Sequence, residues 1–218
     1  MCLRKVVLDT ETTGLSHASG DRIVDVGCVE LWDGVPTGKT FQHYVNPQRT
    51  MPMTAFQIHR LSDVFLSQFP PFEAIYMQLK QFIQDSPLVI HNAPFDLGFL
   101  NAEFLRLGEL PLSNDVIDTL PMAKQKFPGS PANLDALCRK FHISLQKREI
   151  HSALEDAHLL SQVYFHLDKQ QLSLQESSKS KPSPERKPRP IRVFPIPAEE
   201  EEGYEAIKNK FGPSSRSL

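Results

Sequence analysis

The chain has 218 residues, 40% of them hydrophobic, and a formal net charge of −2, which suits one well-filled α/β domain with an appendage. No stretch approaches the roughly 18 to 20 consecutive apolar residues of a membrane span, and residues 1–5 lack the layout of a signal peptide, so we expect a cytoplasmic protein. Cys2, Cys28 and Cys138 form neither a disulfide framework nor a CxxC ligand pair, which predicts reduced, mostly buried thiols.

The charge is divided unevenly along the chain. Residues 1–169 hold 15 basic and 19 acidic side chains, whereas residues 170–218 hold 9 and 7. The first part is therefore acidic and lacks the basic surface that binds nucleic acid by itself. A polyanionic substrate would need metal ions and a partner protein to hold it.

Three strands are predicted at the start of the chain. Residues 6–8 are apolar β-formers, residues 22–32 alternate between apolar and polar side chains, and residues 39–45 form a third candidate. Asp33 and Gly34 between the second and third candidates indicate a hairpin turn. We therefore expect an antiparallel meander.

Strands alternate with helices further along the chain, after a stretch to residue 71 that is expected to be loop with short helices. Apolar spacing and helix-start signals predict two strands, at 88–90 and 115–119, and helices at 71–84, 94–107, 120–126, 133–141 and 152–167. This order predicts an α/β fold with a mixed five-stranded sheet flanked by helices on both faces.

The last part of the chain differs in composition. Residues 170–197 are rich in Ser, Lys and Pro, with six prolines between Pro182 and Pro197, which predicts a flexible linker after a domain at 1–169. Within the final segment, 198–218, residues 198–211 could form a helix whose acidic start and basic end suit the helix dipole. A helix of about 14 residues is marginal alone, so we expect it to order against a partner; a disordered, solubilising tail is the alternative.

Two acids follow the first strand. Asp9 and Glu11 are two residues apart and therefore point to the same face of a strand. Paired carboxylates repel each other unless a cation or a proton lies between them, and hard cations such as Mg²⁺ or Mn²⁺ prefer such ligands. The pair is predicted to be half of a metal site; the alternative is a strand end whose acids face water.

A third acid lies in the first turn after the fourth strand. Asp96 is placed where a helix N-terminus favours an anion. If the first and fourth strands are parallel neighbours, this turn lies beside Asp9 and Glu11. The alternative is an acid that only neutralises the helix dipole.

The last long helix supplies two more candidates. Ser152 and Glu155 form a capping-box pattern, which starts the helix at Ser152 and leaves His151 in the preceding loop and Asp156 within the first turns. Four carboxylates and one loop histidine fit two-metal phosphodiester cleavage, in which the histidine is the general base. Four other acids are interpreted as edge or capping residues: Asp25, Asp115, Asp118 and Asp135.

These motifs resemble a known family. The segments Asp9-Thr-Glu11, His91-Asn-Ala-Pro-Phe-Asp96 and His151-x4-Asp156 are similar to the three motifs of the DEDDh 3′→5′ exonucleases, over roughly residues 3–169. Residues 127–129 and 133–138 resemble the subfamily of proofreading epsilon subunits of bacterial DNA polymerase III.

The resemblance implies a ribonuclease-H-like fold with two divalent ions, Mg or Mn, held by Asp9, Glu11, Asp96 and Asp156, and with His151 as general base. It also implies that the 3′-terminal nucleotide is contacted by Asp9, Thr10, Glu11, Thr12, His59, Asn92 and Asp156. The chain departs from the family pattern at two positions. Arg60 follows His59 where glycine is usual, and Thr54 replaces an acid.

The function implied by the resemblance is proofreading, the removal of mispaired 3′-terminal deoxynucleotides by a subunit of the replicative polymerase. The expected partners are the DNA 3′ end, the polymerase catalytic subunit through residues 198–218, and the sliding clamp through Gln171–Leu174. Two alternatives stay open: a 3′→5′ exoribonuclease of the same superfamily, and a catalytically idle scaffold that links clamp and polymerase.

Overall fold

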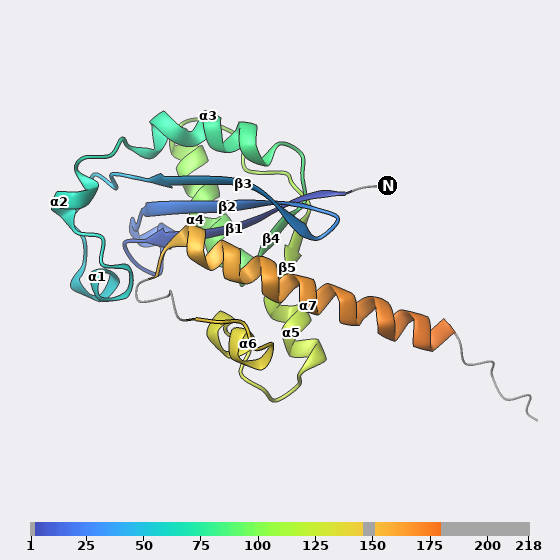
Figure 1. Cartoon of the computed structure of the whole chain (residues 1–218). Coiled ribbons are helices and arrows are strands. Elements are labelled where there is room, and N and C mark those ends of the chain that lie inside the picture. Colours follow the sequence, from blue (N-terminus) through green and yellow to red (C-terminus); the bar gives the residue numbers. More distant parts are fainter. Residues whose placement is uncertain (1–2, 146–150, 180–218) are drawn as a thin grey trace, which may run out of the picture. The chain divides into compact units, whose positions relative to one another are not determined.

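The central strand of the sheet is β1 (Arg4–Thr12). The computed structural model describes residues 3–145 and 151–179, with side chains to residue 168, and its five strands follow the order β3-β2-β1-β4-β5 (Figure 1). The apolar residues Val6, Val7 and Leu8 are fully buried, as expected for a strand with neighbours on both sides. The predicted mixed five-stranded sheet is confirmed.

The antiparallel half of the sheet is the predicted meander. β2 (Ile23–Trp32) pairs with β1 on one side and with β3 (Val35–Tyr44) on the other. Asp33 and Gly34, which connect β2 to β3, both have positive φ, 52° and 79°. This conformation matches the twist of the flanking strands and closes a two-residue hairpin.

The parallel half consists of two short strands. β4 (Leu88–Ile90) lies parallel to β1, with Val6 opposite Leu88 and Val7 opposite Val89, and β5 (Val116–Asp118) lies parallel to β4. The first and fourth strands are therefore parallel neighbours. This arrangement brings the start of the helix after β4 to the end of β1.

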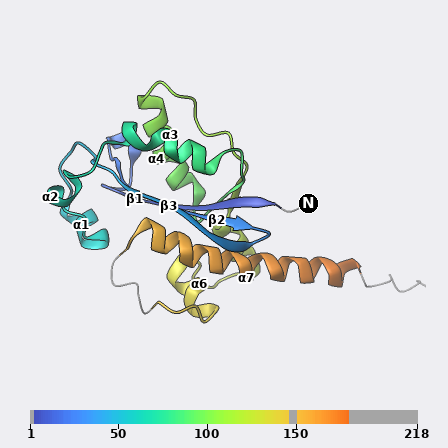
Figure 2. The same ribbon diagram turned by 45° about the horizontal axis from the view of Figure 1, so that its top comes forward.

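Helices cover both faces of the sheet (Figures 1 and 2). On one face, α3 (Phe72–Ile83) and α4 (Ala93–Arg106) pack on Val6 and Leu8. On the other face, α7 (Ala153–Lys179) packs on Val7. The remaining helices are shorter: α1 (Met53–His59), α2 (Asp63–Leu66), α5 (Thr119–Lys126), α6 (Leu134–Lys140) and a 3-10 helix at His17–Ser19.

The last helix is longer than predicted. We expected α7 to end near residue 167 and a linker to begin at residue 170, but the helix continues to Lys179. Residues 168–179 contain neither proline nor glycine, and three Gln, two Leu, two Lys and one Glu among them are good helix formers. The rest of the predicted linker and the segment 198–218 lie outside the described residues.

Two further expectations concern cysteines and membranes. Cys28 and Cys138 are buried free thiols, as predicted, whereas Cys2 lies outside the described residues. Across residues 3–145 and 151–179, no helix combines the length and the apolar character that a membrane crossing needs.

Candidate active site

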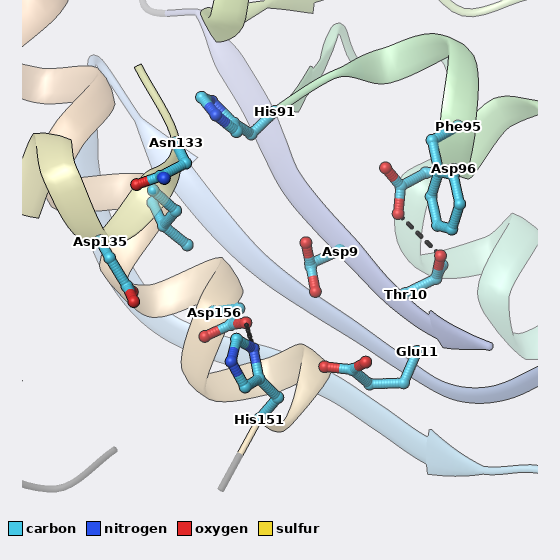
Figure 3. A pocket seen from close by; sticks show the side chains of 11 residues that line it. Asp9, Thr10, Glu11, His91, Phe95, Asp96, Asn133, Asp135, His151 and Asp156 are labelled. Carbon is cyan, nitrogen blue, oxygen red and sulfur yellow. Dashed lines mark hydrogen bonds and ion pairs between the residues drawn. The ribbon is translucent and has the colours of Figure 1, made fainter. Parts of the chain in front are cut away.

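The end of β1 forms the floor of a pocket of about 390 Å³. Asp9 and Glu11 share a face of β1 with Val7, the face covered by α7, and both line the pocket (Figure 3). All five residues predicted to act chemically line this one pocket: Asp9, Glu11, Asp96, His151 and Asp156. Residues that are up to 147 positions apart in the sequence therefore meet at one site.

Asp96 is positioned by the start of α4. Asn92, the N-cap residue, has a left-handed conformation with φ 68°, and the Asp118 carboxylate accepts the amide protons of Asn92 (3.0 Å) and Ala93 (3.1 Å). Asp96 follows in the first turn, only 3% exposed, and accepts a 2.7 Å hydrogen bond from the Thr10 hydroxyl. Thr10 thus joins α4 to β1.

His151 and Asp156 lie on either side of the start of α7. His151 Nδ1 is 3.2 Å from Asp156 Oδ2, and the Asp156 amide donates to the Ser152 carbonyl at 2.9 Å. The helix begins next to Ser152, as predicted. The Ser152 hydroxyl, however, turns toward Asp25 and Gln42 on the sheet, which the capping-box interpretation did not foresee.

Burial raises the pKa of two carboxylates of the pocket, Asp9 and Asp96. Burial, followed by the charges of Asp96, Asp156 and Glu11, raises the pKa of Asp9 well above its ordinary value. Burial also raises the pKa of Asp96 to about 7, even though the Thr10 hydroxyl opposes the shift. Carboxylates in this situation are ionised at neutral pH only at a cost that a bound cation would remove.

The donor set of the pocket suits a hard divalent cation. Glu11, His151 and Asp156 each offer one ligand atom, and these atoms lie within 4.8 Å of one another. Carboxylate oxygens predominate among the donors, and no thiol is found among the described residues that line the pocket, which favours Mg²⁺ or Mn²⁺ over thiophilic ions.

The predicted nucleotide contacts divide into two groups. Asp9, Thr10, Glu11 and Asp156 line the pocket, whereas Thr12, His59 and Asn92 are not among its lining residues. The Thr12 hydroxyl donates to the Gly14 carbonyl, Asn92 is exposed, and His59 is only 2% exposed. Burial lowers the pKa of His59, so its neutral form is favoured.

Arg60 explains one departure from the family pattern. It caps the C-terminus of α1 in the left-handed conformation, with φ 60°. Glycine adopts this conformation without strain, which would account for the glycine that the resemblance leads us to expect at this position. In this chain an arginine takes the same conformation.

Five further lining residues of the pocket were not predicted. Two of them, His91 and Phe95, lie inside the second motif, and three lie around the start of α6: Asn133, Leu134 and Asp135. Burial lowers the pKa of His91, and its Nδ1 lies 2.8 Å from the Thr119 hydroxyl. The sequence signals for these residues were the second motif, which contains His91 and Phe95, and the epsilon-like segment 133–138, which contains the other three.

Three of the acids that were interpreted as edge or capping residues have different roles in the structure. Asp118 accepts the Leu120 amide at 2.9 Å and caps α5, as interpreted. Asp25 is not an edge residue, because β2 lies inside the sheet, but it does cap α7 by accepting the Ala153 amide. Asp135 lines the pocket as well as lying in the first turn of α6.

Comparison with known proteins agrees with this fold and pocket. The RNase T family model, described as an exonuclease, matches residues 6–164. Among solved structures, Exonuclease X in complex with 5′-overhanging duplex DNA is 25% identical with a TM-score of 0.62, covering 76% of this chain and 91% of that one. The nuclease domain of 3′hExo, a DEDDh family member bound to rAMP, has the same fold at 15% identity, with a TM-score of 0.67 over 77% and 92% of the two chains. The chain is therefore an exonuclease of the RNase T, or DEDDh, family with a ribonuclease-H-like fold.

Curated relatives narrow this assignment. DNA polymerase III subunit epsilon of Rickettsia felis is 48% identical over 169 residues, which is 76% of this chain and 74% of that protein. The Escherichia coli subunit is 39% identical over 179 residues, with coverage of 78% and 74%. The chain belongs with the DNA polymerase III epsilon subunits, which are 3′→5′ proofreading exonucleases.

Proposed function

We propose that this chain removes mispaired 3′-terminal deoxynucleotides as a subunit of the replicative polymerase of a bacterial cytoplasm. In this proposal two divalent ions, Mg or Mn, are held by the carboxylates of Asp9, Glu11, Asp96 and Asp156. The observation that carries the proposal is the convergence of these four carboxylates and His151 on one pocket. Bound divalent ions supply Lewis-acid stabilisation of the negative charge that develops on phosphate oxygens.

His151 is proposed as the general base. Its Nδ1 faces Asp156 Oδ2 at 3.2 Å, so a neutral ring that donates from Nδ1 presents the lone pair of Nε2. Nε2 would then take a proton from the attacking water. The same contact fixes the orientation of the ring, because Asp156 lies on a rigid helix.

Asp156→Asn tests the proposed metal site. The substitution removes one negative charge with little change in shape, so we expect the rate of nucleotide release to fall by about two orders of magnitude or more. The measurement is mononucleotide release from single-stranded DNA, together with a urea unfolding curve to show that the fold is retained.

Glu155→Gln is the matched control for this test. Glu155 is the exposed neighbour of Asp156 in the same turn, so its neutral variant should keep the wild-type rate. Wild-type activity in Asp156→Asn would contradict the proposed ligand set, whereas a folded wild-type protein that releases no nucleotide would support the idle-scaffold alternative.

The RNA-trimming alternative has the same metal chemistry, so the substrate must decide. The relationship to polymerase III epsilon subunits favours DNA. An enzyme that selects RNA through contacts to the ribose 2′-hydroxyl degrades an RNA oligomer faster than a DNA oligomer of the same sequence. Wild-type protein should prefer DNA, and a preference for RNA would reverse the order of the two hypotheses.

The C-terminal part of the chain is proposed to hold the partners. In this hypothesis residues 198–218 bind the polymerase catalytic subunit, residues 170–197 connect them to the exonuclease domain, and Gln171–Leu174 binds the sliding clamp. Tethering would supply the effective concentration that a domain with four excess acidic charges needs near DNA.

Deletion of residues 190–218 tests this role. We expect the shortened chain to lose its association with the polymerase catalytic subunit, measured by gel filtration of the mixture. Excision of short single-stranded oligomers should continue at the wild-type rate, because the pocket residues all precede residue 157. Loss of both properties would mean that these residues belong to the exonuclease domain.

A further inference from the structure

Two residues of β2 face the proposed metal ligands across the sheet. In the antiparallel pairing, Asp25 lies opposite Glu11 and Gly27 lies opposite Asp9. Residues directly opposite each other in such a pair project to the same face. Asp25 therefore lies on the face of β1 that carries the active site, yet it does not line the pocket.

The Asp25 carboxylate is used by the start of α7. Its Oδ2 accepts the amide proton of Ala153 at 3.0 Å and lies 3.5 Å from the Ser152 hydroxyl. The Gln42 side-chain amide on β3 donates to the same oxygen at 3.2 Å and to the Ser152 hydroxyl at 3.2 Å. Asp25 itself is fully buried, so these bonds form away from water.

Gly27 allows the helix to approach this closely. A Cβ atom at Gly27 would overlap the carbonyl group of Ala153 and the nitrogen of Leu154. The backbone of the first turn of α7 therefore lies directly on the strand, opposite Asp9. Any larger side chain would push the start of the helix away from the sheet.

The anchored residue lies between the two functional residues of this segment. His151 precedes Ala153 by two positions and Asp156 follows it by three, so one attachment point governs both side chains. We propose that Asp25 is a positioning residue of the exonuclease, which holds the first turn of α7 so that His151 and Asp156 meet Glu11. This inference rests on the proposed roles of His151 and Asp156.

Variants of Asp25 separate positioning from ordinary helix capping. In Asp25→Ala the amide of Ala153 loses its acceptor and the first turn of α7 can shift. We expect kcat on single-stranded DNA to fall about a hundredfold, because displacements of about 1 Å in an active site cost that much. KM should change far less, and the Mn²⁺ concentration for half-maximal activity should rise because Asp156 moves.

Asp25→Asn should rescue activity. The asparagine oxygen can still accept the Ala153 amide, while Gln42 can rotate its side-chain amide to accept from the new NH₂ group. We expect kcat within about tenfold of wild type, since one neutral hydrogen bond replaces a charged one. A role in capping alone predicts that neither variant changes kcat once the protein is folded.

Glu30→Ala is the matched control. Glu30 is another buried carboxylate on β2, but it belongs to the opposite face, where it accepts bonds from Arg4 at 2.7 Å and Thr37 at 2.8 Å. This variant should lower the resistance to urea and leave kcat of the folded protein unchanged. The experiment uses the full-length chain throughout.

The outcomes are distinguishable. A folded Asp25→Ala protein with wild-type kcat would overturn the positioning role, and so would an equal loss of kcat in Glu30→Ala. If Asp25→Ala does not fold, Gly27→Ala decides: lowered kcat in a folded protein supports the inference, and wild-type kcat overturns it. An inactive wild-type protein would overturn the proposed function, and this inference with it.

Discussion

Alternation along β1 gives each residue of the Asp9-Thr10-Glu11 segment a separate task. The two acids project to the face of the strand that α7 covers. Thr10, which also lines the pocket, projects to the other face and donates to Asp96 at 2.7 Å. The threonine therefore does more than separate two proposed metal ligands. It connects the strand to the third carboxylate.

Thr10→Val should weaken metal binding through Asp96. The hydroxyl stabilises the ionised carboxylate, so its loss should raise the pKa of Asp96 further above its value of about 7. Because the cation binds the ionised form, the Mn²⁺ concentration for half-maximal activity should rise by about tenfold at neutral pH. The increase in the required Mn²⁺ concentration should be smaller at alkaline pH, where Asp96 is ionised in both the wild type and the variant.

Thr40→Val is the control for this comparison, because Thr40 is an exposed residue of β3. It should keep the wild-type metal requirement. An unchanged requirement in Thr10→Val would mean that the Thr10 hydroxyl has no influence on Asp96.

The sequence predicted those residues of the site whose positions follow from local patterns in the chain. Strand alternation placed Asp9 and Glu11 together, and helix-start signals placed Asp96 and Asp156 in first turns. The pocket lining formed by Asn133, Leu134 and Asp135 was not predicted, because it depends on the path of the chain between α5 and α6. No local pattern specifies such a path, and the same holds for the burial of His59.

At the scale of elements, the strands and helices to residue 145 agree with the prediction within a few residues. Apolar periodicity and turn residues determine these elements, because each must bury one face against the sheet. The predicted end of α7 was wrong. The composition changes after residue 167, but residues 168–179 include none that stops a helix. Composition alone therefore did not locate this boundary.

Leu79→Ala should separate stability from activity. Leu79 lies on α3, is fully buried and packs on the face of the sheet that is covered by α3 and α4. Its truncation should lower the free energy of unfolding by about 2–5 kcal/mol. Urea unfolding measures this loss, while kcat of the folded protein should stay unchanged because α3 contributes no residue to the pocket.

Met77→Ala is the control, since Met77 on the same helix is 49% exposed. It should change the free energy of unfolding by less than about 0.5 kcal/mol. A fall in kcat for fully folded Leu79→Ala would show that α3 takes part in catalysis.

At the scale of the whole molecule, we expect proton binding and metal binding to compete at the carboxylate cluster. In the metal-free protein the folded-state pKa of Asp96 is about 7, above its ordinary value of 3.8. The contribution of the protonated Asp96 carboxyl to the free energy of unfolding is therefore fully present below about pH 3.8 and is lost as the pH rises through about 7. Asp9 has a shift in the same direction.

Mn²⁺ should consequently stabilise the protein more at about pH 8 than at about pH 5, because the cation binds the ionised carboxylates. The measurement is the free energy of unfolding in urea with a chelator and with saturating Mn²⁺. Burial lowers the pKa values of His59 and His91, so these residues give the free energy of unfolding the opposite pH dependence. They contribute both to the series with chelator and to the series with Mn²⁺, and their contributions cancel when one series is subtracted from the other. Equal metal stabilisation at both pH values would contradict the buried-cluster interpretation.

The shortness of β4 fixes where the pocket can form. The strand pairs with β1 only at Val6 and Val7 and ends at Ile90, so the chain leaves the sheet just before it reaches the level of Asp9. A strand advances about 3.3 Å per residue, so an insertion of two residues would carry the start of α4 about 6.6 Å further along the sheet. That distance exceeds the reach of the Thr10 hydroxyl to Asp96, and the sheet could thus accept a longer β4 only by dismantling the site beside it.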